Sequence, residues 1–333
     1  MVDPSGADAM ASTPAPSTAP RTTKASGRLS WPRAEFHMAA VLHSNLVNML
    51  VSERIGQLFM ETDVGRDRLE FTEYGDGDAW VVLVPAELLP RRMQQPLARF
   101  LAAQGLHVVT LDPLGHGRSD RPADPQAYSV TAFAEQVVAL LDHLGAPQAV
   151  VGGSSLGANV ALETAAIAPE RVRGLILEAP ILDNGVESGI LTFGPLLLTA
   201  RFLPLAVTAL RRATRPVPRG IVPFWAGIAL DTCDQRPGAV AALLHGLFFG
   251  RAAPSARERR RIDVPALVVG HPLDLMRPLA DAEMLAGELP RATLLRARTP
   301  LEWRLRPHRL DQAALDLATQ CWRTPRRRRR AGS

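Results

Sequence analysis

Short apolar runs and helix-length segments alternate along most of this chain of 333 residues, and that alternation constrains the fold more than any other feature. Continuous apolar runs predict strands buried on both faces, and helices between such strands predict right-handed crossovers in a parallel sheet. The predicted strands cover residues 80–84, 106–112, 149–153, 172–178, 266–270 and 293–297. The predicted helices cover residues 96–104, 130–144, 156–168, 279–289 and 309–321. The fold class is therefore α/β, with a mostly parallel, doubly wound central sheet.

The segments before this alternation are typical of an antiparallel start to the sheet. Residues 56–62 and 68–74 alternate apolar and polar side chains, the first only loosely, as half-buried strands do. The Gly-Asp-Gly-Asp run at 75–78 predicts a hairpin turn before the strand at 80–84. Residues 31–52 carry apolar residues at mixed spacing, for which a helix is the prediction.

The alternation stops at about residue 183 and resumes at about residue 263. The segment between is apolar, helix-like and contains several prolines, which predicts a helical lid inserted after the sixth strand. Its large apolar residues, among them Leu191, Phe193 and Phe202, fit a lid over an apolar pocket, and ordinary packing of lid against core explains them equally well. The predicted organisation is a disordered tail (1–30), a core (31–182 and 263–323), a lid (183–262) and an arginine-rich tail (324–333).

The charge balance argues against a nucleic-acid-binding body. The formal net charge is +5, and the five arginines at 326–330 account for all of it, because the remaining 33 basic and 33 acidic residues cancel. That run could hold phosphates, but we prefer a solvated tail and expect no nucleic-acid partner. The only lysine, Lys24, lies in the N-terminal tail, which excludes a Schiff-base lysine or a phosphate-loop lysine in the body.

The cysteines and histidines do not form a metal-binding pattern. Cys233 and Cys321 are the only cysteines, and no two histidines stand at ligand spacing on one predicted helix. We expect neither a metal nor a cofactor.

No targeting or membrane-spanning segment is expected. Residues 1–30 lack the basic start and the apolar run of a secretory signal. The apolar segment 189–210 is interrupted by Pro195, Pro204 and Arg201, which favours buried or cleft-lining helices over a bilayer span. The expected location is cytoplasmic, and the sequence leaves the oligomeric state open.

The strongest chemical signal is the run Gly-Ser-Ser-Leu-Gly at 153–157, which lies between a predicted strand and a predicted helix. This is the context that a Gly-x-Ser-x-Gly nucleophile turn requires. Glycines at both ends allow close backbone packing, and Ser155 is held at the apex, where the helix N-terminus favours a developing negative charge. A glycine-rich turn without chemistry is the alternative.

A second motif, Asp-Pro-Leu-Gly-His-Gly-Arg-Ser at 112–119, directly follows another predicted strand. Together the two motifs resemble the α/β-hydrolase family, in which Asp-x-x-Gly-x-Gly-x-Ser follows an early parallel strand. The resemblance covers about residues 66–182 and 263–320 and implies the α/β-hydrolase fold with a lid between. It also implies that the 112–119 loop is structural, with His116 a loop histidine rather than a base.

The same resemblance implies roles for two residues. Ser155 takes the position of the nucleophile, and Asp274, in a Gly-His-Pro-Leu-Asp run that starts at Gly270, takes that of the acid that orients a histidine. For Asp274 the alternative is a loop aspartate that caps the helix predicted near Leu279.

The triad histidine is missing from its expected place. In the family it follows the last strand, but residues 296–307 contain no histidine, and Pro300 stands about where it should be. A serine hydroxyl is a poor nucleophile without a base. His271 is the best substitute by sequence, His245 in the lid is a weaker one, and His308 is expected to point away from the cleft.

The loop that supplies oxyanion donors also departs from the family pattern. Its usual His-Gly is replaced by Pro85 and Ala86. The N–H of Leu156 remains as one donor, and Ala86 or Glu87 is the candidate for the second. A loop that no longer forms an oxyanion hole is the alternative, and a carboxylate at Glu87 would oppose negative charge.

Two functions follow from these residues. The first is a serine-nucleophile hydrolase that acts on a small apolar ester-like substrate. The second is a catalytically decayed protein of the same fold, which binds an apolar ligand or a protein partner. The complete nucleophile turn favours the first, and the missing histidine favours the second.

Overall fold

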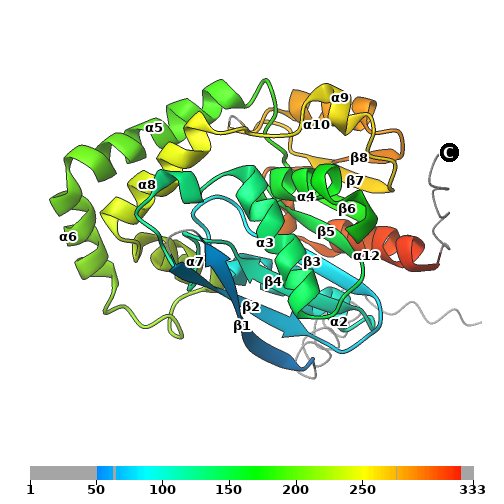
Figure 1. The fold of residues 1–333 in the computed structure, drawn as a ribbon, viewed down its shortest axis with the longest axis horizontal. Helices are drawn as coiled ribbons and strands as arrows, with labels where there is room; N and C mark the ends of the chain where they lie inside the picture. Colours follow the sequence, from blue (N-terminus) through cyan, green and yellow to red (C-terminus); the bar gives the residue numbers. More distant parts are fainter. Residues whose placement is uncertain (1–50, 63–64, 275, 324–333) are drawn as a thin grey trace, which may run out of the picture. The chain divides into compact units, whose positions relative to one another are not determined.

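The computed structural model describes residues 51–62, 65–274 and 276–323, which form a sheet with helices on both faces (Figure 1). The strands are β1 (Glu53–Thr62), β2 (Gly65–Tyr74), β3 (Trp80–Val84), β4 (His107–Asp112), β5 (Ala149–Ser154), β6 (Val172–Glu178), β7 (Ala266–Gly270) and β8 (Ala292–Arg296). The helices around the sheet are η1 (Arg91–Gln94), α2 (Gln95–Ala102), η2 (Pro125–Ala127), α3 (Val130–His143), α4 (Leu156–Ile167), η3 (Pro169–Arg171), α10 (Leu279–Glu288), α11 (Glu302–Leu305) and α12 (His308–Arg323).

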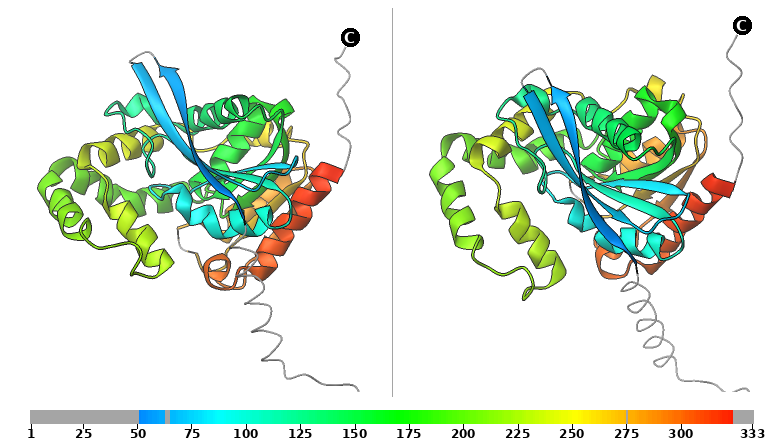
Figure 2. Two further views of the ribbon diagram at one scale, coloured as in Figure 1. Left: turned by 90° about the horizontal axis from the view of Figure 1, so that it is seen from below. Right: turned by 60° about the horizontal axis from the view of Figure 1, so that its bottom comes forward.

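The sheet confirms the predicted fold class. Its strand order is β1-β2-β4-β3-β5-β6-β7-β8, and every pair from β4 to β8 is parallel. Among the strands that the structure describes, only β1 with β2, and β2 with β4, pair antiparallel, and the first two strands run as a long twisted pair (Figure 2). The carboxyl ends of the parallel strands therefore meet along one edge, where the 112–119 and 153–157 motifs both lie.

The hairpin predicted at 75–78 is wrong. Strand β2 pairs with β1 and β4, and β3 pairs with β4 and β5, so the segment at 75–78 connects two strands that are not neighbours. The hairpin instead joins β1 to β2, whose register places Thr62 opposite Gly65. The glycines at 75–78 serve a close approach of chains, because a Cβ at Gly77 would lie 2.0 Å from the carbonyl oxygen of Gly105.

Alternating side chains of the strands form two apolar layers, one on each face of the sheet. Val82 and Val151 belong to the layer covered by α3, α4 and α10, whereas Val81 and Val150 belong to the layer covered by α2 and α12. This alternation follows from the strand geometry and fixes the direction in which each residue near a strand end points.

A helical insertion follows β6, as predicted. It comprises α5 (Val186–Phe202), α6 (Pro204–Thr214), α7 (Phe224–Cys233), α8 (Pro237–Phe249) and α9 (Ala256–Arg259). Phe193 packs against the α3–α4 layer, but Leu191 and Phe202 are 78% and 72% exposed, so these two do not line a closed apolar pocket.

Across the described segments, no single helix has the length and hydropathy of a membrane span, and the one pair that reaches them together, α5 and α6, is bent by 99°. The helix predicted at 31–52 lies outside the described residues except for 51 and 52, which are not helical. Both predicted tails, residues 1–30 and 324–333, lie entirely outside the described residues.

Candidate functional site

Ser155 stands in a strained backbone conformation between β5 and α4. Its φ is 54° and its ψ is −114°, a region that residues other than glycine rarely occupy and that costs roughly 1–3 kcal/mol. The N–H of Ser155 donates to the carbonyl of Glu178 at 2.8 Å, which ties the turn to the neighbouring strand. Strain of this kind persists only where the surrounding structure holds it in place.

The flanking glycines provide that support. A Cβ at Gly153 would lie 2.5 Å from the carbonyl oxygen of Val84, and one at Gly157 would lie 2.3 Å from the same atom. Both glycines are therefore required for the turn to pack against the end of β3. The N–H of Leu156, in the first turn of α4, is one of the groups at a helix start without an intrahelical acceptor.

The loop after β3 supplies no second oxyanion donor from Ala86. The N–H of Ala86 donates to Sδ of Met93 at 3.2 Å, inside an apolar cluster with Ile228 of α7. The side chain of Glu87 buries Oε1 without a hydrogen-bond partner among the described residues, and this burial raises the pKa of Glu87 to about 7. A protonated carboxyl here would not oppose an oxyanion, whereas an ionised one would.

The structure does not bring His271 to Ser155. Nε2 of His271 lies 3.1 Å from Oε1 of Glu178, and Nδ1 lies 3.2 Å from the carbonyl oxygen of Thr299. Both ring nitrogens therefore face hydrogen-bond acceptors of the buried interior, and neither points to Oγ of Ser155. The reason is strand alternation: Leu267 and Val269 of β7 face the α12 layer, and His271 continues that series.

Glu178 is the centre of a buried polar cluster that the sequence analysis missed. Its Oε2 lies 2.5 Å from a guanidinium nitrogen of Arg304 and accepts a hydrogen bond from Oγ of Ser154. Ser154 also receives hydrogen bonds from Arg304 at 3.1 Å and from the amide of Gln94 at 3.2 Å. Burial alone would raise the pKa of Glu178, but the charge of Arg304 and the hydrogen bond from His271 outweigh it and lower the pKa to about 2.

This cluster is not a substrate site. The cavity beside it measures only about 10 Å³, room for about one water molecule, and Ser154, Glu178 and His271 are each 5% exposed or less. The one sequence signal for the cluster is an acidic residue, Glu178, directly after the apolar run at 175–177 of β6.

Asp274 takes neither role considered for it, because the residue at the start of α10 is Pro278 and no side chain caps that helix. Its Oδ1 accepts hydrogen bonds from the N–H groups of Met276 and Arg277, and its Oδ2 lies 2.9 Å from a guanidinium nitrogen of Arg277. These bonds close the turn before α10. Asp274 and His271 make no hydrogen bond to each other in the described part of the chain, so the predicted acid–histidine pair does not form.

The remaining histidine candidates also lie in other surroundings. His116 is fully buried, with Nδ1 3.0 Å from the carbonyl of Leu114, and burial lowers its pKa to about 4. His245 packs against Phe249 in the insertion, with ring centroids 4.7 Å apart, and His308 is the first residue of α12. Within residues 51–62, 65–274 and 276–323, Ser155 Oγ makes no hydrogen bond with a histidine, and no group of three or more potential ligands could hold a metal ion.

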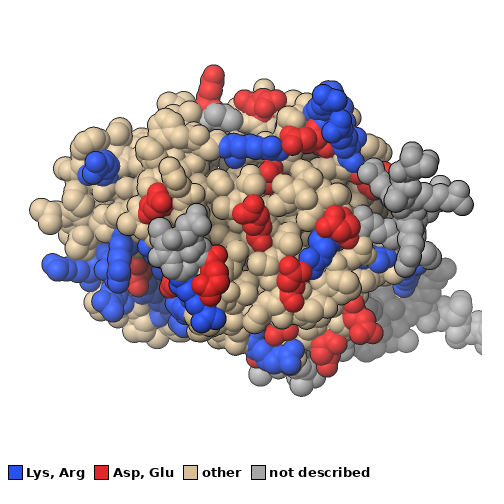
Figure 3. Space-filling model, viewed as in Figure 1, with Lys and Arg blue, Asp and Glu red and all other residues tan. Residues whose placement is uncertain are grey.

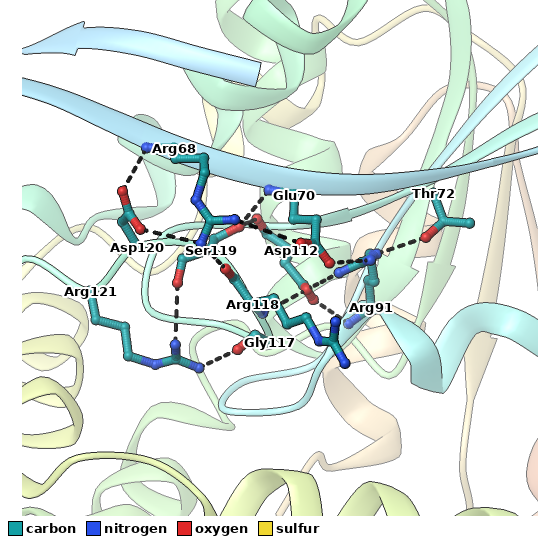
Figure 4. A network of polar contacts seen from close by, with 10 residues as sticks. All are labelled: Arg68, Glu70, Thr72, Arg91, Asp112, Gly117, Arg118, Ser119, Asp120 and Arg121. Atoms are coloured by element: carbon teal, nitrogen blue, oxygen red, sulfur yellow. Dashed lines mark hydrogen bonds and ion pairs between the residues drawn. The ribbon is translucent and has the colours of Figure 1, made fainter. Parts of the chain in front are cut away.

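The 112–119 motif forms a structural loop (Figure 4). Asp112 is fully buried and accepts hydrogen bonds from the backbone N–H groups of Arg91 and Arg118 and from the Arg91 guanidinium. The hydroxyl of Ser119 donates to the carbonyl of Asp112 at 2.6 Å and accepts from the N–H of Glu70 at 2.9 Å. The loop is thus fastened to β2 and to η1.

The sequence of this chain matches one family model and several known proteins. A family model described as "alpha/beta hydrolase fold" matches residues 79–207. The chain is 27% identical over 251 residues to 3-oxoadipate enol-lactonase 2 of Acinetobacter baylyi, covering 71% of this chain and 87% of that protein. It is 42% identical over 78 residues to 2-hydroxymuconate semialdehyde hydrolase of Pseudomonas putida, which is 23% of this chain and 27% of that protein.

Among solved structures, the enol-lactonase from Burkholderia xenovorans superimposes with a TM-score of 0.63 at 21% identity. That match covers 79% of this chain and all of the other, and at this identity it supports the fold alone.

Proposed function

Because this chain belongs to the α/β-hydrolase fold family and its curated relatives are named as hydrolases, we propose that it hydrolyses a small apolar ester or lactone with Ser155 as nucleophile. The observation that carries the proposal is the strained backbone of Ser155 at the start of α4. A turn without chemistry has no reason to keep a serine in that conformation when glycine would remove the strain.

In this reaction Oγ of Ser155 attacks the carbonyl carbon and its proton passes to a solvent water molecule. The N–H of Leu156 donates to the resulting oxyanion, and collapse of the oxyanion breaks the bond to the alkoxy oxygen. That oxygen takes a proton from solvent and leaves as the alcohol of an ester, or remains on the acyl chain as a hydroxyl in a lactone. Water then hydrolyses the acyl-enzyme and restores the Ser155 hydroxyl. No imidazole contacts Ser155 within the described residues, and a site that lacks one triad member keeps roughly 10³–10⁴-fold acceleration over water. We therefore expect slow turnover and a preference for esters or lactones with good leaving groups.

A second candidate function is supported by one observation. Both ring nitrogens of His271 face hydrogen-bond acceptors, as a purely structural histidine would. This favours a protein that binds an apolar ligand or a partner without turnover.

A fluorophosphonate probe separates the two functions, because it reports an activated serine without knowledge of the substrate. We expect purified protein to be labelled, Ser155→Ala to lose all labelling, and His271→Gln to keep it. Circular dichroism would first establish that each variant is folded. Folded wild-type protein that takes up no probe and cleaves no p-nitrophenyl ester would overturn the hydrolase proposal and leave the second function.

A further inference from the structure

A large groove lies apart from Ser155, between the 112–121 loop and the helical insertion. Its volume is about 880 Å³, within the range of small-molecule sites, and its lining contains neither Ser155 nor Leu156. Most such sites are lined by apolar side chains, but this one is lined by nine arginines and five acidic residues. Figure 3 shows basic side chains gathered on the side of the molecule that carries α6 and α7.

This surplus of positive charge is local. Outside the five arginines at 326–330, basic and acidic residues of the whole chain are equal in number, so composition alone does not account for it. Neighbouring carboxylates neutralise some of the arginines, since Arg211 pairs with Asp234 at 2.9 Å and Arg219 pairs with Asp231 at 3.0 Å.

Three other arginines of the groove keep unengaged guanidinium groups. Arg118 comes from the core loop, Arg215 follows α6, and Arg236 precedes α8; all three are exposed, and none has a side-chain hydrogen bond or ion pair with another described residue. Beside them, Arg121 donates to the carbonyl of Ser119 at 3.2 Å, while its Nε is buried without a hydrogen-bond partner in the described part of the chain. Burial is the main cause that lowers the pKa of Arg121, and the positive charge of Arg236 adds to it.

From this arrangement we infer that the groove binds a multiply charged small oxyanion, such as a phosphorylated compound or a polycarboxylate. Guanidinium groups present paired N–H donors that match the oxygens of phosphate and carboxylate, and arginines from two parts of the fold can engage one anion from opposite sides. Such an anion would offset the mutual repulsion of the unpaired arginines. Because Arg118 belongs to the core and Arg215 and Arg236 belong to the insertion, the bound anion would also join the two.

Calorimetric titration of the full chain tests this inference, with inorganic tripolyphosphate as the probe in one arm and citrate in the other. We expect saturable binding at about 20 mM NaCl that weakens at about 200 mM NaCl, because salt screens exposed charges. Tighter binding of tripolyphosphate would assign phosphate chemistry to the site, and tighter binding of citrate would assign polycarboxylate chemistry; either supports the inference.

The variants Arg118→Gln and Arg215→Gln should each weaken binding about tenfold or more. The matched control is Arg212→Gln, which removes an exposed arginine of α6 that does not line the groove and should leave the affinity unchanged. Absence of binding by both probes, or equal weakening by Arg212→Gln, would overturn the inference. Ser155→Ala should bind the anion as the wild type does, so this result stands apart from the proposed hydrolysis.

Discussion

The two adjacent serines at the end of β5 face different surroundings. Ser155 occupies the strained turn, whereas Ser154 lies in the buried cluster of Glu178, Arg304 and Gln94. In that cluster the carboxylate of Glu178 neutralises the guanidinium of Arg304 and also contacts His271. Substitution of Glu178 therefore tests the stability of the cluster most directly.

Replacing Glu178 by Gln should destabilise the fold by roughly 3 kcal/mol, because it leaves Arg304 and His271 without their anionic partner. Urea unfolding at pH 7 measures this. The matched control is Glu283→Gln, which breaks an exposed ion pair with Arg296 and should cost less than about 1 kcal/mol. Equal losses for the two variants would contradict the assignment of a buried, coupled charge.

The depressed pKa of Glu178 also sets an acid limit for wild-type stability. The folded-state value is about 2, below the ordinary value of 4.5, so the stabilisation is complete above about pH 4.5 and is lost as the pH falls toward 2. Unfolding curves between pH 5 and pH 2.5 should therefore show a smaller decline in Glu178→Gln than in the wild type.

Asp311 of α12 should show the opposite pH dependence. Burial raises its pKa from 3.8 to about 7, so the folded state binds more protons than the unfolded state and the contribution of Asp311 to stability falls as the pH rises from about 4 to 7. Asp311→Asn keeps the acceptor for Nε1 of Trp303, which lies 2.7 Å from Oδ1. The variant should gain about 2 kcal/mol relative to the wild type between pH 5 and pH 8.

Urea unfolding at these two pH values checks the prediction, with the exposed Asp316→Asn on the same helix as control. If the stability difference between wild type and Asp311→Asn did not change with pH, the carboxyl would be ionised in the fold and the prediction would be wrong.

At the scale of elements, the buried Asp112 joins the end of β4 to η1 and to its own loop. Asp112→Asn should cost roughly 3–5 kcal/mol, because the Arg91 guanidinium would lose a buried carboxylate. Asp120→Asn is the control: its side chain is 43% exposed and accepts from the N–H of Arg68 at 2.9 Å, so about 1 kcal/mol is expected. Thermal unfolding of both variants distinguishes a buried junction from an ordinary loop contact.

Most strands and helices are predictable from the sequence because each depends on the pattern of apolar and polar residues within its own segment. The predicted strands at 80–84, 172–178 and 266–270 have the same bounds as β3, β6 and β7, and the motif at 153–157 forms the turn between β5 and α4, as predicted. The hairpin at 75–78 was mistaken because strand order depends on long-range pairing, which local turn residues do not report.

The side-chain geometry of the site was much less predictable. Whether His271 points toward Ser155 or away from it depends on which face of the sheet its side chain occupies at the end of β7. The contact between Arg304 and Glu178 joins residues that are 126 positions apart in the sequence, so no local pattern predicts it. The pairing of Asp274 with Arg277 was accessible in principle, because an aspartate before a helix commonly caps the preceding turn.

At the scale of the whole molecule, the last described helices complete one apolar layer of the sheet. Trp303, Leu310 and Ala314 are buried there, so a chain that ends at residue 300 should expose that layer and bind the dye ANS without a cooperative unfolding transition. A chain that ends at Arg323 removes no described residue and should unfold cooperatively. Cooperative unfolding of the shorter chain would show that the layer is dispensable.

The cluster around Glu178 also orders the steps of synthesis. During synthesis Gln94, Ser154 and Glu178 are made well before Arg304. The carboxylate of Glu178 therefore has no ion pair with Arg304 until the final part of the chain emerges from the ribosome. Closing the sheet before that moment would bury an uncompensated anion, which is costly. The nascent core should therefore stay open on the α12 side until release, and docking of the C-terminal segment becomes the step that commits the chain to its fold.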